Sequence, residues 1–294
     1  MYRGRFAPSP TGPLHLGSLL AAVGSYLQAK SNKGNWLLRI EDIDPPREPK
    51  GAADLILKDL EAFGFEWDGV PQYQSTHLAF YQDVVSDLLT MKKAYYCSCS
   101  RKLISQTAIR NNTGFIYTGR CREKSLSDGA IRLLTHDKMI YFNDKLQGTF
   151  KQNIEHEVGD FILKRSDKQY AYHIAVVIDD HLQNITEIVR GNDLLAVTPR
   201  HIYLQSILNY HIPEYLHLPL ITHPNGDKLS KQTGAKPLNK KYPVQQLYKV
   251  LTMLGQNPDK SLQYEPLNNF WEWAIKNWEL ARVPRTIPQF VNEM

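Results

Sequence analysis

The sequence has no long apolar run. No stretch of it approaches the roughly eighteen apolar residues that a membrane-spanning helix requires. The N-terminal segment Met1–Phe6 lacks the apolar core of a secretory signal peptide. These absences predict a cytoplasmic protein with no membrane partner.

Charge of one sign is also not in large excess. The formal net charge is +5, and charged residues make up 22% of the 294 residues, as in ordinary folded chains. Hydrophobic residues make up 42%, which is enough for a sizeable core. The charge is uneven, because residues 228–285 contain ten Lys or Arg and four Asp or Glu. Such a segment suits a polyanion such as RNA, although a solvated lysine-rich surface has the same composition.

Cysteine is scarce, and the three cysteines are clustered. Cys97, Cys99 and Cys121 fall within 25 positions, and an odd number argues against a disulfide framework. Three soft thiolates favour Zn²⁺ in a structural site, which normally has four ligands. The residues alone leave open a cluster of reduced cysteines without metal.

Strand and helix patterns alternate through the first part of the chain. A short strand at 3–6 precedes a Pro/Gly-rich loop, and apolar residues at helical spacing follow from 16 to 27. A buried strand is expected at 36–40, and helices are expected at 53–63 and 81–91. This alternation predicts an α/β fold with a Rossmann-like, doubly wound parallel sheet.

The pattern changes near residue 92. Polar residues dominate as far as residue 154, and long helical patterns are absent, which indicates an inserted subdomain. Strands are expected at 130–134, 139–142, 161–164, 170–179 and 185–189, and helices at 199–210, 244–254 and 270–278.

These patterns predict four parts. Residues 1–91 form the first half of a Rossmann-like catalytic domain, and residues 92–155 form an inserted subdomain containing the candidate zinc site. Residues 156–240 form the second half of the catalytic domain, and residues 241–294 form a short helical C-terminal part.

The loop before the first helix carries the first functional motif. Residues 8–18 read PSPTGPLHLGS, and ligands of open α/β sheets bind at the ends of strands. Backbone N–H groups at a helix start favour phosphate. Gly17 permits a close approach to the backbone, and His15 can donate to phosphate oxygens. Alone, a His-x-Gly segment is weak evidence, and an ordinary Pro/Gly loop is the alternative.

A second motif, KLSKQ at residues 228–232, is expected in a loop after a strand near Ile221. Its two lysines can reach one polyphosphate, and adenylyl transfer depends mainly on positioning and on neutralising developing charge. An isolated Lys-x-x-Lys is more simply a solvated basic turn. Together with the first motif, it indicates a nucleotide site.

The two motifs together resemble the HIGH and KMSKS signatures of class I aminoacyl-tRNA synthetases. Residues 5–12 (RFAPSPTG) and 39–47 (RIEDIDPPR) resemble the glutamyl branch of that family. Residues 160–165 (DFILKR), 177–180 (VIDD) and 189–191 (VRG) resemble the glutamyl-Q tRNA(Asp) synthetases within it.

Three residues depart from these patterns. Ser18 stands where the generic first signature has a second histidine, and Gln232 replaces the final serine of the other. Both of these residues resemble those usual at the same positions in the glutamyl-Q branch. His173 follows Tyr172 where glutamine is expected, and it affects a detail of the amino-acid pocket.

The amino-acid pocket can also be argued from charge. A ligand with two carboxylates and one ammonium group needs cationic partners and one anion. Arg5 and Arg190 are candidates for the carboxylates, because a guanidinium can donate two hydrogen bonds to a carboxylate. Glu41 is the candidate for the ammonium group, and Ser9 and Tyr172 can add hydroxyl hydrogen bonds. Each arginine alone could equally form a surface ion pair, but the resemblance implies that all five surround L-glutamate.

The resemblance also implies an ATP site, with Mg²⁺ on the phosphates, and a structural zinc site. A Cys-x-Cys…Tyr-x-x-x-Cys pattern makes Tyr117 the fourth zinc ligand, beside the three cysteines. The residues implied to be catalytic are His15, Lys228 and Lys231, and those implied to bind ATP are His15, Gly17, Ser18, Lys228, Ser230 and Lys231.

The implied reaction has two steps. ATP and L-glutamate give glutamyl-adenylate without tRNA, and the glutamyl group then passes to the queuosine base in the anticodon of tRNA(Asp). Only 62 residues follow Gln232, so we expect no large anticodon-binding domain. The anticodon stem-loop would instead enter the active site of a monomer. The alternatives are a truncated glutamyl-tRNA synthetase that charges a tRNA 3′ end, and an RNA-binding module that has lost catalysis.

Overall fold

The computed structural model describes residues 1–111, 114–222 and 235–287. An N-terminal sheet has the strand order β1-β2-β3, and all of its pairs are parallel. A second sheet has the order β11-β12-β8-β9, parallel except for the hairpin β8–β9. The strands are β1 (Arg3–Phe6), β2 (Asn35–Ile40), β3 (Gln72–Tyr73), β8 (Met139–Asp144), β9 (Gly148–Asn153), β11 (Glu187–Gly191) and β12 (Glu214–Leu218).

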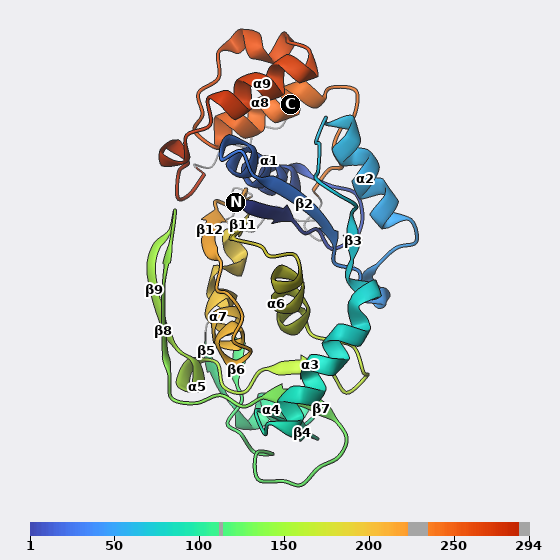
Figure 1. Cartoon of the computed structure of the whole chain (residues 1–294), viewed down its shortest axis with the longest axis vertical. Helices are drawn as coiled ribbons and strands as arrows, with labels where there is room; N and C mark the ends of the chain where they lie inside the picture. The colour runs from blue at the N-terminus through green and yellow to red at the C-terminus, as the bar shows by residue number, and fades with distance from the viewer. Residues whose placement is uncertain (112–113, 223–234, 288–294) are drawn as a thin grey trace.

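The two sheets adjoin at β1 and β11. The backbone N–H of Thr186 donates to the carbonyl of Arg3 over 2.9 Å, beside the start of both strands. The parallel strands therefore follow the order β3-β2-β1-β11-β12 (Figure 1). After β1 the chain forms β2 and β3 on one side of β1, and it later forms β11 on the other side. This reversal in strand order is the topology that opens a ligand crevice. The predicted parallel sheet of an α/β fold is confirmed.

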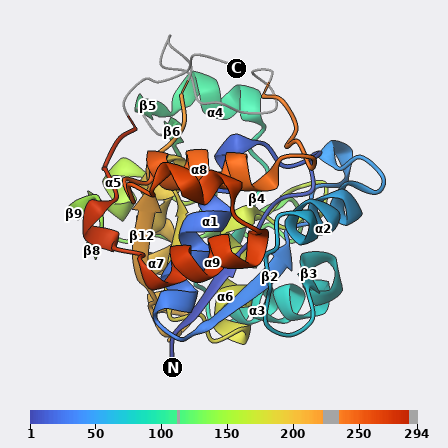
Figure 2. The same ribbon diagram turned by 90° about the horizontal axis from the view of Figure 1, so that it is seen from above.

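One face of the sheet is covered by α1 (Leu16–Ser31), which in turn packs against α8 (Pro243–Met253) and α9 (Leu267–Lys276). Figures 1 and 2 show these two C-terminal helices stacked on α1. Aromatic rings join the layers, since Tyr26 of α1 packs edge-on against Trp271 of α9 with ring centroids 4.8 Å apart. The helix α2 (Ala52–Ala62) flanks β2 and β3 in Figure 1.

The second core lies beneath β11 and β12, around α3 (Leu78–Thr90), α6 (Tyr172–Leu182) and α7 (Thr198–Ile207). The predicted strand at 170–179 is wrong, because this segment begins the helix α6. Its residues Ile174 to Asp180 are all buried. A helix buried on all sides has a continuous apolar run, which periodicity alone does not distinguish from a buried strand.

The segment from β4 to β10 contains several short strands. A three-stranded antiparallel sheet has the order β10-β7-β4, and a two-stranded hairpin joins β5 and β6. The predicted strands at 130–134 and 139–142 correspond to β7 and β8. The elements are β4 (Ala94–Cys97), α4 (Arg101–Thr107), β5 (Ile109–Asn111), β6 (Gly114–Ile116), β7 (Ala130–Leu133), α5 (Ile154–Glu157) and β10 (Ile162–Lys164).

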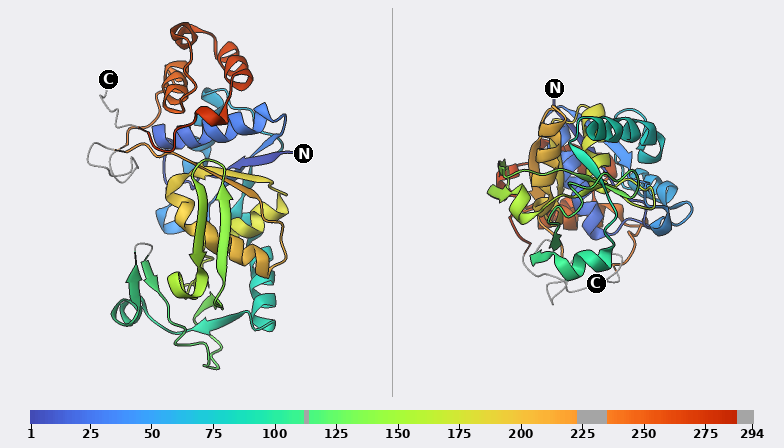
Figure 3. Two further views of the ribbon diagram at one scale, coloured as in Figure 1. Left: turned by 90° about the vertical axis from the view of Figure 1, so that its left-hand side faces the viewer. Right: turned by 90° about the horizontal axis from the view of Figure 1, so that it is seen from below.

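Residues 92–155 are joined to the rest of the molecule by strand pairing and by side-chain contacts. Asp144 of β8 pairs with Tyr215 of β12, β7 pairs with β10, and the hydroxyl of Tyr203 donates to the carbonyl of Leu134. Figure 3 shows the hairpin β8–β9 running from the main sheet toward the strands β4, β7 and β10. The strand expected near Ile221 is β12, which ends earlier at Leu218. None of the helices in the described parts of the chain is long and apolar enough to cross a membrane.

Candidate active site and metal site

A cleft of about 1260 Å³ opens at the carboxyl ends of β1, β2 and β11. It is lined by the loop before α1, by the segment after β2 and by the start of α6. The motif at 228–232, with Lys228, Ser230 and Lys231, lies outside the described residues. The other predicted glutamate and ATP residues all line the cleft, namely Arg5, Ser9, His15, Gly17, Ser18, Glu41, Tyr172 and Arg190.

The first motif forms the N-terminal cap of α1. The Nδ1 atom of His15 accepts a hydrogen bond from the backbone N–H of Gly17 over 3.1 Å. The hydroxyl of Ser18 accepts from the backbone N–H of His15 and donates to its carbonyl. A neutral His15 therefore carries its proton on Nε2. In this structure the side chain of Ser18 therefore caps the helix.

A buried ionic cluster lies at the floor of the cleft. Arg5 donates from Nε to Asp180 over 3.0 Å, and Arg39 donates to the same carboxylate oxygen over 2.9 Å. Arg39 is fully buried and also lies 3.6 Å from Glu41 and 3.8 Å from Asp179. Two guanidinium groups and three carboxyl groups therefore share one dry region, where their charges interact strongly.

Burial changes the ionisation of Glu41. It raises the pKa of Glu41 to about 7, although Arg39 and Arg5 favour its charged form. Asp180 behaves differently: burial opposes its ionisation, but ion pairs and hydrogen bonds with Arg5 and Arg39 keep its pKa below the usual value. Glu41 is thus the carboxyl group here that can gain or lose a proton near neutral pH.

Arg190 lies at the end of β11 with every N–H group directed at a protein atom. It donates from Nε to His217 Nε2 over 3.0 Å and from Nη2 to Thr198 over 2.8 Å. Longer contacts of 3.3 Å reach Tyr172 Oη, His201 Nδ1 and the Leu194 carbonyl. Its guanidinium group is therefore held rigidly in one orientation.

His217 is in turn fixed by a residue of the hairpin β8–β9. Its Nδ1 lies 2.6 Å from Oδ2 of Asp144, and neither side chain is exposed. Asp144 ends β8, so the hairpin β8–β9 supplies the group that orients Arg190 through His217.

Several of these supporting residues were not predicted to belong to the site. Arg39 and Asp180 lie in the segments RIEDIDPPR and VIDD, and their signal was charge within apolar runs, since buried charges are normally paired. Asp144, His201 and His217 carry no such signal, because each lies in an unremarkable stretch far from the others in sequence.

The three cysteines come together as predicted. Their sulfur atoms all lie within 4.8 Å of one another. The hydroxyl of Tyr117 lies 3.3 Å from the sulfur of Cys97 and 3.5 Å from that of Cys99, and it accepts from the backbone N–H of Cys121. Ligands of a tetrahedral zinc ion with Zn–S bonds near 2.3 Å are about 3.8 Å apart. The four side chains fit such an ion.

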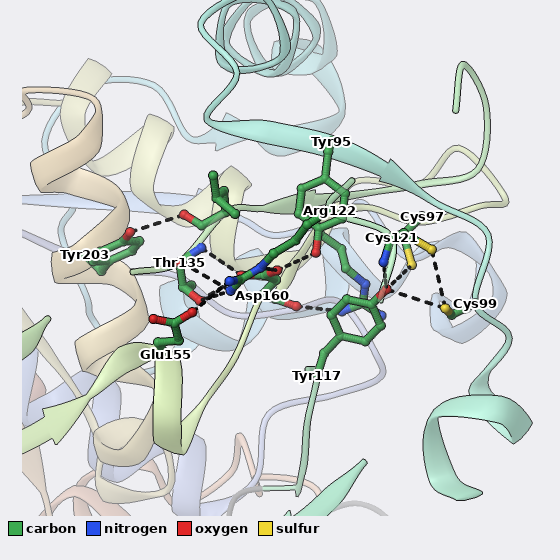
Figure 4. A network of polar contacts seen from close by, with 12 residues as sticks. Tyr95, Cys97, Cys99, Tyr117, Cys121, Arg122, Thr135, Glu155, Asp160 and Tyr203 are labelled. Carbon is green, nitrogen blue, oxygen red and sulfur yellow. Dashed lines mark hydrogen bonds and ion pairs between the residues drawn. The ribbon is translucent and has the colours of Figure 1, made fainter. Parts of the chain in front are cut away.

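A network of ion pairs links this cluster to the cleft (Figure 4). Arg122, next to Cys121, donates to both carboxylate oxygens of Asp160 over 2.7 and 2.8 Å and also reaches Glu155. Arg132 donates to the carbonyl of Asp160 and lies over the ring of Tyr117, 3.9 Å from its centroid. Arg132 and Tyr117 also line the cleft, so the cysteine cluster lies behind residues of its wall.

Comparison with known proteins identifies the family. Residues 1–265 match the model of the catalytic domain of class I tRNA synthetases for E and Q. A protein named glutamyl-Q tRNA(Asp) synthetase from Chromobacterium violaceum is 48% identical over 288 residues, 97% of this chain and 96% of the relative. A protein of the same name from Aromatoleum aromaticum is 46% identical, covering 97% of this chain and 91% of the relative.

Similar solved structures come from the glutamate branch of the same family. The glutamate-tRNA synthetase of Elizabethkingia anophelis superposes with a TM-score of 0.82 at 28% identity, covering 99% of this chain and 68% of that one. The glutamate tRNA ligase of Elizabethkingia meningosepticum, solved with its amino acid, superposes with a TM-score of 0.80. The chain belongs to the class I glutamyl and glutaminyl tRNA synthetases and, within them, to the glutamyl-Q tRNA(Asp) synthetases.

Proposed function

We propose that the protein activates L-glutamate with ATP and transfers it to the queuosine base in the anticodon of tRNA(Asp). The observation that carries this proposal is the name shared by relatives 46–48% identical over nearly their whole length. The residues of the cleft are consistent with the chemistry of the first step.

The glutamate pocket would use the buried ionic cluster. Arg5 donates from Nε to Asp180 and from Nη1 to the carbonyl of Val189. Its Nη2 makes no hydrogen bond to the part of the chain that is described. That edge is available for a carboxylate. Glu41, in its ionised form, would bind the ammonium group, and Ser9, on the loop before α1, would add a hydroxyl contact.

Arg190 would act partly through Tyr172. Because the Tyr172 hydroxyl accepts from Arg190, its own O–H is left to donate to a substrate carboxylate. Burial raises the pKa of Tyr172, which keeps the hydroxyl protonated. The fixed charge of Arg190 would attract the same carboxylate.

The ATP site would lie at the start of α1. We assign His15, Gly17 and Ser18 to it, together with Lys228, Ser230 and Lys231, which lie outside the described residues. The helix N-terminus would favour the phosphates, and His15 would donate from Nε2. Mg²⁺ would enter with ATP as its substrate complex. His15, Lys228 and Lys231 would meet the charge that develops as pyrophosphate departs.

Zinc would be held by Cys97, Cys99, Cys121 and Tyr117, as a structural ion. Burial opposes ionisation of Cys121, but hydrogen bonds with Tyr117 and with the backbone of Ser98 lower its pKa to about 6. An ion there would join β4 to the loop after β6 and so stiffen the inserted segment at residues 92–155. We keep this segment, with 1–91, 156–240 and 241–294, as the proposed division of the chain.

The second step would bring the anticodon stem-loop of queuosine-containing tRNA(Asp) to the cleft. Since one chain supplies all the candidate pocket residues, we expect a monomer to be active. We also expect it to act in the cytoplasm, where its substrates are found. The rival is a glutamyl-tRNA synthetase that charges a tRNA 3′ end. It is favoured by the likeness to solved glutamate-tRNA synthetases.

Two assays separate the proposed function from its alternatives. The first measures ATP–pyrophosphate exchange with L-glutamate in the absence of RNA, where we expect activity. If no exchange occurs either without RNA or with RNA added, the protein has lost catalysis.

The second assay supplies [¹⁴C]glutamate and ATP with two tRNA(Asp) samples, one containing queuosine and one containing guanosine. We expect labelling of the first sample alone, and an isolated anticodon stem-loop should suffice. Equal labelling that disappears when the 3′-terminal adenosine is removed would support the rival function instead. Labelling should weaken steeply with salt, because binding to phosphates releases counterions.

A further inference from the structure

A chain of buried hydrogen bonds runs from the inserted hairpin to the cleft wall. It starts at Asp144, passes through His217 to Arg190, and continues to His201 and His173. The successive donor–acceptor distances are 2.6, 3.0, 3.3 and 3.1 Å. Asp144, His217, Arg190 and His201 are buried, whereas His173 is partly exposed and lines the cleft.

The chemistry of arginine fixes the direction of every hydrogen bond in this chain. A guanidinium group donates and never accepts. His217 must therefore present a lone pair at Nε2 to Arg190, and it carries its proton on Nδ1, facing Asp144. His201 likewise presents a lone pair at Nδ1 to Arg190, so its proton lies on Nε2.

The same logic decides the state of the last residue. The Nε2–H of His201 donates to Nδ1 of His173, so a neutral His173 carries its proton on Nε2. That atom has no hydrogen-bond partner within the described ranges of the chain. Burial, together with the nearby charges of Arg200 and Arg190, lowers the pKa of His173 to about 3 and keeps the ring neutral.

We propose that His173 is a further substrate-positioning residue, whose Nε2–H donates to the amino-acid carboxylate that is not activated. This inference rests on the proposed function and adds a residue to its pocket. His173 follows Tyr172 directly, and the phenol ring of Tyr172 lies edge-on to it with centroids 5.8 Å apart. Both residues can thus present a donor at the same wall of the cleft.

The rigidity of the chain explains which carboxylate it suits. The activated carboxylate must move toward ATP as the adenylate forms, whereas the other carboxylate stays in place. A donor whose orientation is set by four buried side chains is best matched to a group that does not move. Its neutral N–H favours an acceptor and leaves the charge balance of the pocket to Arg5, Arg190 and Glu41.

The main test compares three variants by ATP–pyrophosphate exchange. His173→Phe removes the donor and should raise the KM for glutamate about 10- to 100-fold, as loss of one hydrogen bond to a charged group does. In each of the three variants, the KM for ATP should change less than about twofold. His173→Gln should restore most of the affinity, because its amide can accept from His201 and donate to the cleft. His156→Gln, at an exposed position on α5, is the matched control and should match the wild type.

A second measurement does not depend on any variant folding. ¹⁵N spectra of the histidine-labelled wild type should show His173 as the Nε2–H tautomer, and L-glutamate should shift this nitrogen. An Nδ1–H tautomer, or an unchanged glutamate KM in well-folded His173→Phe, would overturn the proposal. Absence of glutamate-dependent exchange in the wild type would instead overturn the proposed function itself, and the inference with it.

Discussion

Replacing Asp144 by Asn tests how the hairpin β8–β9 supports the cleft. Both carboxylate oxygens of Asp144 are in use. Oδ1 accepts the backbone N–H groups of Leu146, Gln147 and His217 over 3.1, 2.8 and 3.2 Å. Oδ2 accepts from His217 Nδ1 over 2.6 Å. The carboxylate therefore serves four donors in a place that water does not reach.

An Asn side chain keeps the first set of contacts and reverses the last. With its oxygen at the Oδ1 position, its NH₂ group faces Nδ1–H of His217, and two donors oppose one another. His217 can relieve this only by moving its proton to Nε2, where it then opposes the Nε–H of Arg190. Either arrangement leaves one buried donor unsatisfied, which costs about 1–3 kcal/mol.

We therefore expect Asp144→Asn to lower the free energy of unfolding by about 1–3 kcal/mol. At about 2–4 °C for each kcal/mol, the melting temperature should fall by roughly 2–12 °C. The KM for glutamate should rise severalfold, because Arg190 loses its fixed orientation, while the KM for ATP changes little.

Thermal unfolding and ATP–pyrophosphate exchange, both at neutral pH, measure these effects. The matched control is Asp137→Asn, because Asp137 also faces a histidine, His156, but both are exposed on the surface. It should change stability by less than about 0.5 kcal/mol. A wild-type melting temperature and a wild-type glutamate KM in Asp144→Asn would refute the tautomer argument.

Four further outcomes are expected. Arg190→Ala should raise the KM for glutamate at least about 30-fold, since an unpaired buried carboxylate costs roughly 2–5 kcal/mol, and an unchanged KM would remove Arg190 from the pocket. In the wild type the same KM should fall from pH 6 to pH 8, as Glu41 loses the proton held by its pKa of about 7. Glu41→Gln should abolish that pH dependence, and its persistence would mean that another group titrates. Elemental analysis should find about one zinc per chain, and Cys99→Ser should lose both the metal and thermal stability; equal stability with and without metal would contradict a structural ion. Lys231→Ala should slow exchange about 10²–10³-fold while glutamate binding, measured by calorimetry, persists; wild-type exchange would refute its role.

Glu41 also makes a contribution to stability with a definite sign. Its folded-state pKa lies above the ordinary value of 4.5, so the folded protein holds the proton more tightly than the unfolded chain. The stability contributed by this group is present at low pH and is lost as pH rises from about 4.5 to about 7. Binding of an ammonium group beside Glu41 would offset that loss, which couples substrate binding to ionisation.

Local patterns in the sequence were sufficient for most of the elements and for the candidate residues. Alternating strands and amphipathic helices predicted the parallel sheet, because hydrophobic periodicity reflects which face of an element is buried. The spacing of Cys97, Cys99 and Cys121 predicted a cluster, because thiols so close in sequence can meet without long-range folding. The motif after the first strand placed His15 and Gly17 at the start of a helix for the same local reason.

What the tertiary structure decided are the contacts between segments distant in the chain. Nothing local shows that Asp144, His217 and Arg190 meet, since their partnership depends on β8 lying beside β12, and β12 beside β11. Burial on every side removes the periodicity that separates a helix from a strand, so the sequence of segment 170–179 predicts a strand where the structure has a helix. The tautomer of His173 depends on the same assembly, because a proton's place on an imidazole follows from its neighbours in space.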